Sequence, residues 1–232
     1  MHRKLNGLFS GFVLPYKSNM KEDVVKILKD AGAILEGHFI GVSGRHLSLY
    51  VNKDAWLPHT ELVSAICAML AERNKDKSID IVAGPALGGI PLSQWTAHHL
   101  SHITGKKVLS VFTEKTADGG QALKRGYNAL VKGKRILVVE DTLTTGASVK
   151  NTIDAVSAAG GNVVSLSVII NRDPARITED TFGVPFSALA DLSSESYTEG
   201  EVPEWLRKIP ITTKVGHGDQ YIKKYPDAKH IL

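Results

Sequence analysis

The sequence of 232 residues lacks the features that are typical of disulfide-bonded, membrane-spanning and nucleic-acid-binding proteins. Its single cysteine, Cys67, excludes an internal disulfide framework and a cysteine-based zinc site. No apolar run is long enough to cross a membrane, and no block of Lys and Arg resembles a nucleic-acid-binding arm. Arg3 and Lys4 are not followed by the sustained apolar stretch of a signal peptide. We therefore expect a cytoplasmic protein that binds neither nucleic acid nor membranes.

What is present is the composition of a globular protein. Hydrophobic residues make up 43% and charged residues 22% of the chain, which is enough to bury a core. The net charge of +4 is mild, and a mild positive balance suits polyanionic small-molecule substrates. Cys67 lies in an apolar helical run, where we expect it to be buried as a small hydrophobic side chain.

Strand and helix patterns alternate between residues 58 and 170, which predicts an α/β fold with a mostly parallel central sheet flanked by helices. We divide the chain into an N-terminal extension and hood (1–57), an α/β core (58–190) and a C-terminal extension (191–232), and expect the two outer regions to form a smaller cap. Helices are predicted at 21–31 (capped by Ser18 or Asn19), at 58–72, from about 90, at 149–159 and at 203–208, and strands at 80–83, 107–112, 136–139, 162–170 and 186–190, with two more between 34 and 50.

The most informative stretch runs from Ile136 to Ser148. Four apolar residues precede two acidic ones, and a short run with Thr, Gly and Ser leads into a helical pattern at Val149. This order places the polar run between the carboxyl end of a buried strand and the amino end of a helix, where open α/β sheets bind ligands. Free backbone N–H groups there favour a phosphate, and Gly146 would let the backbone approach it closely.

The two acidic residues, Glu140 and Asp141, narrow the choice of ligand. Carboxylates repel phosphate, but they accept hydrogen bonds from sugar hydroxyls or help to hold a hydrated Mg²⁺. Acceptors for a diol beside a phosphate loop indicate a ribose 5-phosphate ligand. The stretch lacks the Gly-x4-Gly-Lys-Ser/Thr pattern of a P-loop. The alternative is a strand followed by a capped helix without any ligand.

Two further segments have features of a binding site. The glycine-rich loop 84–89 follows a short strand and precedes a helix, which is a second geometry suited to an anion. Residues 113–134 show no helical or strand period, and we predict a long polar loop that acts as a lid, with glycine hinges and cations that reach a polyphosphate on closure. The alternative for 113–134 is a disordered surface loop.

The run from Val138 to Ser148 resembles the 5-phosphoribosyl-1-pyrophosphate (PRPP) binding motif of the type I phosphoribosyltransferases. Segments 37–50, 84–90, 114–127 and 171–172 are similar to those of the orotate phosphoribosyltransferases, in the same order. The resemblance covers roughly residues 20 to 190. It implies the type I fold with a small N-terminal hood, and transfer of ribose 5-phosphate from PRPP to orotate with release of pyrophosphate. It also implies Mg²⁺ as a cofactor, held through substrate and water without fixed protein ligands, and a homodimer that shares its lid loop across subunits.

The resemblance assigns roles to individual positions. Lys115, Glu140 and Asp141 would be catalytic, and Leu49, Tyr50, Thr144 and Arg172 would bind orotate. A guanidinium such as that of Arg172 matches a carboxylate better than a lysine does, whereas the alternative is a solvated residue at a strand end. The positions expected to bind PRPP are Gly88, Gly89, Lys115, Arg125, Glu140, Asp141, Thr142, Leu143, Thr144, Thr145, Gly146, Ala147 and Ser148.

The sequence also departs from the family pattern. Val42 and Gly88 occupy positions where many members have lysine, and Asp118 stands in the lid where one subgroup has a cation. Arg45, Lys115 and Arg125 are the candidates to replace the missing charges. Three alternatives therefore stay open: a phosphoribosyltransferase for another base such as a purine, a PRPP-sensing regulator without turnover, and an α/β domain without a ligand.

Overall fold

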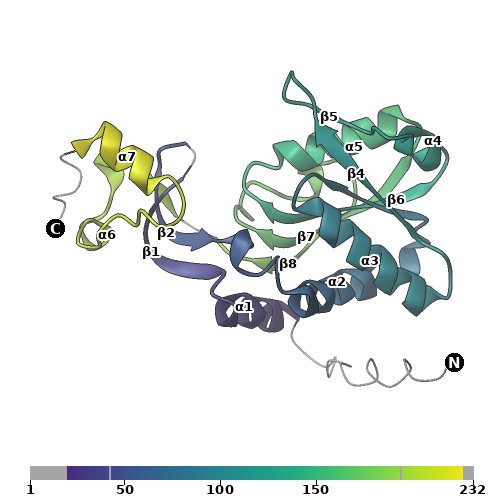
Figure 1. Ribbon diagram of the computed structural model, residues 1–232, viewed down its shortest axis with the longest axis horizontal. Coiled ribbons are helices and arrows are strands. Elements are labelled where there is room, and N and C mark those ends of the chain that lie inside the picture. Colours follow the sequence, from purple (N-terminus) through teal and green to yellow (C-terminus); the bar gives the residue numbers. More distant parts are fainter. Residues whose placement is uncertain (1–19, 42, 194, 227–232) are drawn as a thin grey trace, which may run out of the picture.

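The computed structural model describes residues 20–41, 43–193 and 195–226. The extension at 1–17, the predicted caps Ser18 and Asn19, and Val42 lie outside the described residues. Figure 1 shows a large part built on a central sheet and a smaller part in which the N-terminal strands meet the C-terminal helices.

The large part contains a six-stranded sheet with the order β5-β4-β3-β6-β7-β8. Its strands pair in parallel except for β5, which runs antiparallel to β4. The predicted α/β fold with a mostly parallel sheet is confirmed. The strands are β3 (Ile81–Pro85), β4 (Leu109–Lys115), β5 (Gln121–Ala122), β6 (Arg135–Leu143), β7 (Asn162–Asn171) and β8 (Phe186–Asp191).

Helices cover both faces of this sheet (Figure 1). The central strand β6 shows why its sequence is continuously apolar: Leu137 and Val139 pack in one hydrophobic cluster, Ile136 and Val138 in another, and all four are fully buried. The first cluster includes residues of α1 (Met20–Asp30), α2 (Thr60–Asn74) and α3 (Gly89–Thr104), and the second includes residues of α4 (Tyr127–Val131) and α5 (Ala147–Ala158).

Cys67 on α2 is fully buried in the first cluster, as predicted. Burial raises the pKa of its thiol to about 12, so the side chain behaves as a small hydrophobic group. No helix among the described residues is long and apolar enough to cross a membrane.

The smaller part is a three-stranded sheet, here called the hood, with the order β1-β2-β9. Strands β1 (Ile34–Ile40) and β2 (His46–Val51) come from the N-terminal region, and β9 (Ser196–Tyr197) comes from the C-terminal region. The short helices α6 (Glu204–Arg207) and α7 (Gly218–Lys224) pack against β1. The two ends of the chain therefore build one unit, while the region boundaries at 57 and 190 stay predictions.

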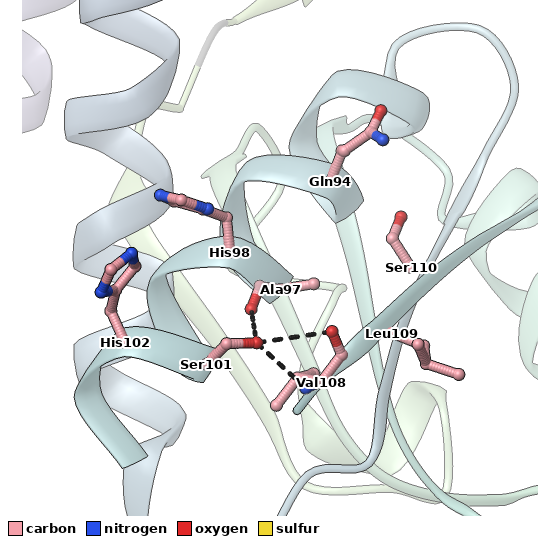
Figure 2. A pocket seen from close by; sticks show the side chains of 8 residues that line it. All are labelled: Gln94, Ala97, His98, Ser101, His102, Val108, Leu109 and Ser110. Atoms are coloured by element: carbon pink, nitrogen blue, oxygen red, sulfur yellow. Dashed lines mark hydrogen bonds between the residues drawn. The ribbon is translucent and has the colours of Figure 1, made fainter. Parts of the chain in front are cut away.

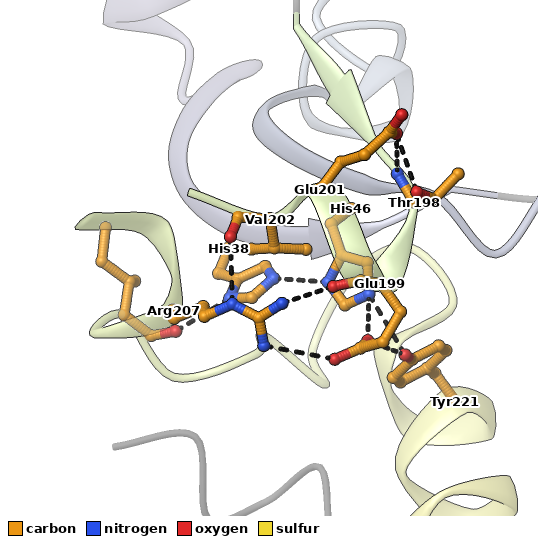
Figure 3. A network of polar contacts seen from close by, with 9 residues as sticks. His38, His46, Thr198, Glu199, Glu201, Val202, Arg207 and Tyr221 are labelled. Atoms are coloured by element: carbon orange, nitrogen blue, oxygen red, sulfur yellow. Dashed lines mark hydrogen bonds and ion pairs between the residues drawn. The ribbon is translucent and has the colours of Figure 1, made fainter. Parts of the chain in front are cut away.

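A polar network centred on two buried histidines joins the hood strands to the C-terminal segment (Figure 3). The rings of His38 and His46 are fully buried and 2.7 Å apart between Nε2 and Nδ1. Burial lowers the pKa of both rings, which favours the neutral forms that can donate and accept one hydrogen bond between them. His46 Nε2 also contacts the Tyr221 hydroxyl at 3.1 Å and Glu199 at 2.8 Å, and Arg207 pairs with Glu199.

The prediction that 113–134 has no regular secondary structure is wrong, while its role as a lid stays a prediction. Strand β4 continues to Lys115 and turns back into β5, with Glu114 opposite Ala122 and Lys115 opposite Gln121. Gly119 has a positive φ of 84°, which the tight turn requires. The paired segment is too short to show strand alternation in the sequence, and α4 is too short to show a helical period. Helix α7 was not predicted for the same reason.

We expect Tyr221→Phe to lower the free energy of unfolding by about 1 kcal/mol, because it removes the hydroxyl that contacts His46 and Glu199. The measurement is urea denaturation of the full chain. Tyr225→Phe is the matched control, since Tyr225 is 48% exposed and lies beside the same helix. Equal stability of Tyr221→Phe and the control would contradict a stabilising role for the network.

Candidate active site

The candidate site lies at the carboxyl ends of the parallel strands. Leu143 at the end of β6 pairs with Asn171 at the end of β7, so the residues that follow, Thr144 and Arg172, begin neighbouring loops. The backbone N–H of Arg172 donates to the carbonyl of Leu143 at 2.9 Å. The structure thus brings together the two strand ends for which the sequence predicted ligand binding.

The loop between β6 and α5 has the form of an anion site. Gly146 precedes α5 with a φ of 75°, and a Cβ added there would lie 2.9 Å from the ring of Phe182, so both backbone and packing require glycine. The N-cap residue Gly146 has no side chain to cap α5, and only the N–H of Ala147 donates to a side chain, Thr145 Oγ1, at 3.4 Å. The N–H groups that follow in the first turn of α5 are open to a ligand. Four predicted PRPP residues are exposed around them: Thr144, Thr145, Ala147 and Ser148. By contrast, Leu143 is 2% exposed and packs in the core, so only its backbone faces the loop.

Glu140 and Asp141 lie inside β6, each 8% exposed. The backbone N–H of Asp141 donates to Glu140 Oε1 at 3.0 Å, and Asp141 Oδ2 has no hydrogen-bond partner among the described residues. Burial, and secondarily the charge of Asp141, raises the pKa of Glu140 to about 8. Burial also raises the pKa of Asp141, against the opposing effect of a nearby lysine. Two buried carboxyl groups, with one oxygen that lacks a donor, suit a ligand that brings hydroxyl groups.

The glycine-rich loop between β3 and α3 meets these carboxylates. A Cβ added at Gly88 would lie 2.5 Å from Asp141 Oδ2, so no side chain fits there in this arrangement. Gly89 packs directly against the backbone of Gly84, which explains the glycines at both positions. The two loops that the sequence predicted as separate anion sites are therefore contiguous.

Lys53 also lies at this junction, and sequence reasoning missed it. Its Nζ is 3.9 Å from Asp141 Oδ2 and 4.0 Å from the position of a Cβ at Gly88. Lys53 opens the short 3-10 helix η1 (Lys53–Ala55), which leads from the hood to α2. No local pattern distinguishes this lysine, because the contact joins segments that are far apart in the sequence.

On the other side of the loop, Arg172 faces the hood. Its Nη2 donates to the carbonyl of Leu49 at 3.4 Å, and its Nε has no partner among the described residues. The guanidinium is half-buried and no carboxylate among those residues pairs with it. Burial lowers the pKa of Arg172, and the nearby Tyr50 opposes this shift. The ring of Tyr50 stacks on that of Phe39, with 5.5 Å between the ring centroids. Leu49 and Tyr50 thus lie beside an unneutralised cation, Thr144 begins the neighbouring loop, and the binding of orotate by these residues stays a prediction.

The three cations proposed to replace the missing lysines differ from one another in their contacts. Arg125 Nε binds Glu114 at 2.8 Å and its guanidinium lies 5.7 Å from the Phe112 ring centroid. Arg45 Nε donates to Ser196 Oγ at 3.0 Å within the hood. Lys115 is exposed at the end of β4, at the base of the hairpin. Asp118 accepts a hydrogen bond from Thr116 within the hairpin turn.

A separate hollow of about 460 Å³ lies between the end of α3 and the start of β4 (Figure 2). His98 and His102 project beside it from successive turns of α3 (Figure 2). Because it lies toward the amino ends of the strands, this hollow is on the opposite edge of the sheet from the candidate site. It contains none of the residues predicted to bind a ligand.

The raised pKa of Glu140 makes a prediction about stability. The folded state binds the proton of the Glu140 carboxyl group more tightly than the unfolded state does, so protonation of Glu140 stabilises the fold. This contribution is complete below about pH 4.5 and is lost as the pH rises through about 8. Glu140→Gln should therefore raise the free energy of unfolding above pH 8, on the order of 2–4 kcal/mol, and change it little at low pH.

Thermal unfolding across this pH range measures the effect. Glu36→Gln is the control, because Glu36 is exposed on the hood. A gain for Glu140→Gln that does not depend on pH would contradict the explanation.

The site can now be compared with known proteins. The family model described as Phosphoribosyl transferase domain matches residues 53–187. The orotate phosphoribosyltransferase of Bartonella henselae is 38% identical over 192 residues, which are 82% of this chain and 94% of the relative. That of Thermus thermophilus is 36% identical over 189 residues, 82% of this chain and 98% of the relative.

Solved structures agree with these relatives. Mycobacterium tuberculosis orotate phosphoribosyltransferase in complex with Fe(III) dicitrate has a TM-score of 0.59 and 25% identity, covering 73% of this chain and 97% of that one. The same enzyme in complex with PRPP has a TM-score of 0.54 and 22% identity, covering 76% and 96%, and it supports the fold. From its sequence and its fold, the chain belongs to the orotate phosphoribosyltransferases of the type I phosphoribosyltransferase family.

Proposed function

We propose that the protein transfers ribose 5-phosphate from PRPP to orotate, giving orotidine 5'-monophosphate and pyrophosphate in the de novo synthesis of UMP. The observation that carries this proposal is the unneutralised guanidinium of Arg172 beside Leu49, next to an open helix terminus and two buried carboxyl groups. One continuous site thus offers a receptor for an anionic base, a phosphate loop and acceptors for ribose hydroxyls.

PRPP would extend across the two loops. The residues from Thr144 to Ser148 would bind the 5-phosphate, because the N-cap residue Gly146 has no side chain to cap the first turn of α5. Glu140 and Asp141 would accept hydrogen bonds from the ribose hydroxyls, which satisfy the unpartnered oxygen of Asp141. The pyrophosphate group would then lie against Gly88 and Gly89, where no side chain blocks the backbone.

Orotate would lie between the hood and the ends of β6 and β7. Its carboxylate would pair with Arg172, whose planar donors suit a bidentate contact. Thr144 and the backbone of Leu49 and Tyr50 would contact the ring. A neutral purine would leave the half-buried guanidinium without a partner, which supports orotate over the alternative bases.

Mg²⁺ fits the donors that are present. The described residues contain no group of three or more His, Cys, Asp or Glu side chains that could hold a metal, whereas Glu140 and Asp141 can contact a hydrated ion carried by PRPP. When bound, Mg²⁺ would neutralise the pyrophosphate as it departs. The chain itself would hold the reactants in register, with charge stabilisation rather than a covalent intermediate as the main effect.

The remaining parts of the proposal concern Lys115 and assembly. Lys115 is exposed at the base of the β4–β5 hairpin, which could present it to leaving pyrophosphate in the site of a second subunit. A homodimer of this kind would be cytoplasmic, as the single buried thiol suits a reducing compartment.

The direct test is the loss of orotate absorbance on mixing the protein with orotate, PRPP and Mg²⁺. We expect turnover that disappears when Mg²⁺ is omitted, because the charge of the pyrophosphate is then unscreened. Hypoxanthine and adenine serve as competing acceptors. Turnover of a purine in preference to orotate would reject the assignment of the base, and PRPP binding without turnover of any base would indicate the regulator.

The role of Arg172 can be tested separately. Arg172→Ala should lower kcat/KM for orotate by about 100-fold or more, since it removes a half-buried partner of the carboxylate. The affinity for PRPP, measured by calorimetry, should change little. Arg176→Ala is the matched control, because Arg176 lies in the same loop, is exposed and pairs only locally with Asp173. Equal losses for orotate and PRPP would contradict a specific role in binding the base.

A further inference from the structure

Lys53 places its ammonium at the point where the two anion loops meet. Its Nζ lies 3.9 Å from Asp141 Oδ2 on one side and 4.0 Å from a Cβ position at Gly88 on the other. The glycine-rich loop itself carries no cation between Gly84 and Gly89. A positive charge is therefore supplied to this loop from the hood connection.

The backbone of Lys53 is fixed on both sides. Asn52 Oδ1 accepts from the N–H of Asp54 at 3.2 Å, which starts the 3-10 helix η1. The carbonyl of Lys53 accepts from the N–H groups of Trp56 at 3.3 Å and Leu57 at 3.1 Å. Trp56 is 2% exposed and packs in the core, so the turn that carries Lys53 is anchored to the α/β part. The side chain is thus directed from a rigid position.

The ammonium keeps its donors for a ligand. The distance of 3.9 Å to Asp141 is an ion pair without a hydrogen bond, and Lys53 Nζ donates to no other described residue. The Lys53 side chain is 54% exposed, while that of Asp141 is 11% exposed. A cation with unused donors faces the solvent here, directly beside backbone that has no side chain at Gly88.

We propose that Lys53 binds the pyrophosphate group of PRPP and replaces the lysine that the β3–α3 loop lacks. The inference rests on the proposed function, because it assigns a residue to the PRPP site described above. It also gives a reason for Gly88: a side chain there would collide with Asp141 Oδ2 and occupy the space next to the ammonium.

Lys53 would act on both the bound substrate and the departing group. As the bond between the anomeric carbon and the pyrophosphate oxygen breaks, the electron pair leaves with that oxygen and negative charge grows on it. The ammonium of Lys53 stabilises this charge, while the base nitrogen, which has already lost its proton to solvent, forms the new bond to carbon. Asp141, in contact with both the ribose and Lys53, would hold the cation over the leaving group.

The experiment compares calorimetric binding of inorganic pyrophosphate with Mg²⁺ and of ribose 5-phosphate to the full chain. Lys53→Ala should weaken pyrophosphate binding by about 10- to 100-fold and ribose 5-phosphate binding by less than about threefold. Lys53→Arg should recover most of the pyrophosphate affinity. Lys106→Ala removes the same charge from an exposed turn beyond α3, away from the site, and should leave both affinities unchanged.

The outcomes separate this inference from the proposed function. Pyrophosphate affinity of Lys53→Ala within about twofold of wild type would overturn the role of Lys53, as would equal weakening of both ligands or no pyrophosphate binding by the wild-type protein. If the wild type binds pyrophosphate and PRPP but consumes no orotate, the proposed function fails, while a selective loss in Lys53→Ala still supports the inference. Melting temperatures of the unliganded variants report whether any loss reflects misfolding.

Discussion

The burial of two adjacent carboxyl groups at the end of β6 is the constraint on which the rest of the site depends. Glu140 and Asp141 are each 8% exposed, and burial raises the pKa of both. Burying such groups lowers the stability of a folded chain, and the neighbouring segments are arranged to accommodate the two carboxyl groups. The glycine at 88 leaves space for Asp141, Lys53 lies on its open side, and α5 begins directly after the strand.

This arrangement follows from the position of β6 in the sheet. The residues from Ile136 to Val139 are apolar on both faces because helices cover both, whereas the polar Glu140 and Asp141 follow toward the carboxyl end of the strand, where the loops gather. Neighbouring β7 brings Arg172 to the same edge, and β3 brings the glycine-rich loop. The polar site is thus the continuation of the buried core, and the rigidity of the core is transmitted to the groups that would bind PRPP.

The sequence predicted those parts of the candidate site whose residues are consecutive in the chain. The thirteen-residue run 136–148 contains the strand, the carboxylates and the loop proposed to bind phosphate in consecutive positions, so periodicity and turn chemistry predicted them together. Arg172 and Leu49 required the family resemblance, because their contact joins the hood to the core. Neither the local sequence pattern nor the family resemblance identified Lys53, since a lone lysine after a strand has no distinguishing pattern. The β4–β5 hairpin and β9 were missed because paired segments of two residues carry no measurable alternation.

The hood has a consequence for the order in which the protein can form. Its strand β2 supplies Leu49 and Tyr50, yet the strand that completes its edge, β9, and the partners of His38 and His46 come from the far end of the chain. A ribosome delivers these segments after the core, so the N-terminal strands leave the exit tunnel before their partners exist. The core can fold during synthesis, while the hood, with the predicted base contacts Leu49 and Tyr50, waits for residues 196–221. Synthesis of that segment thereby becomes a condition for assembling the hood.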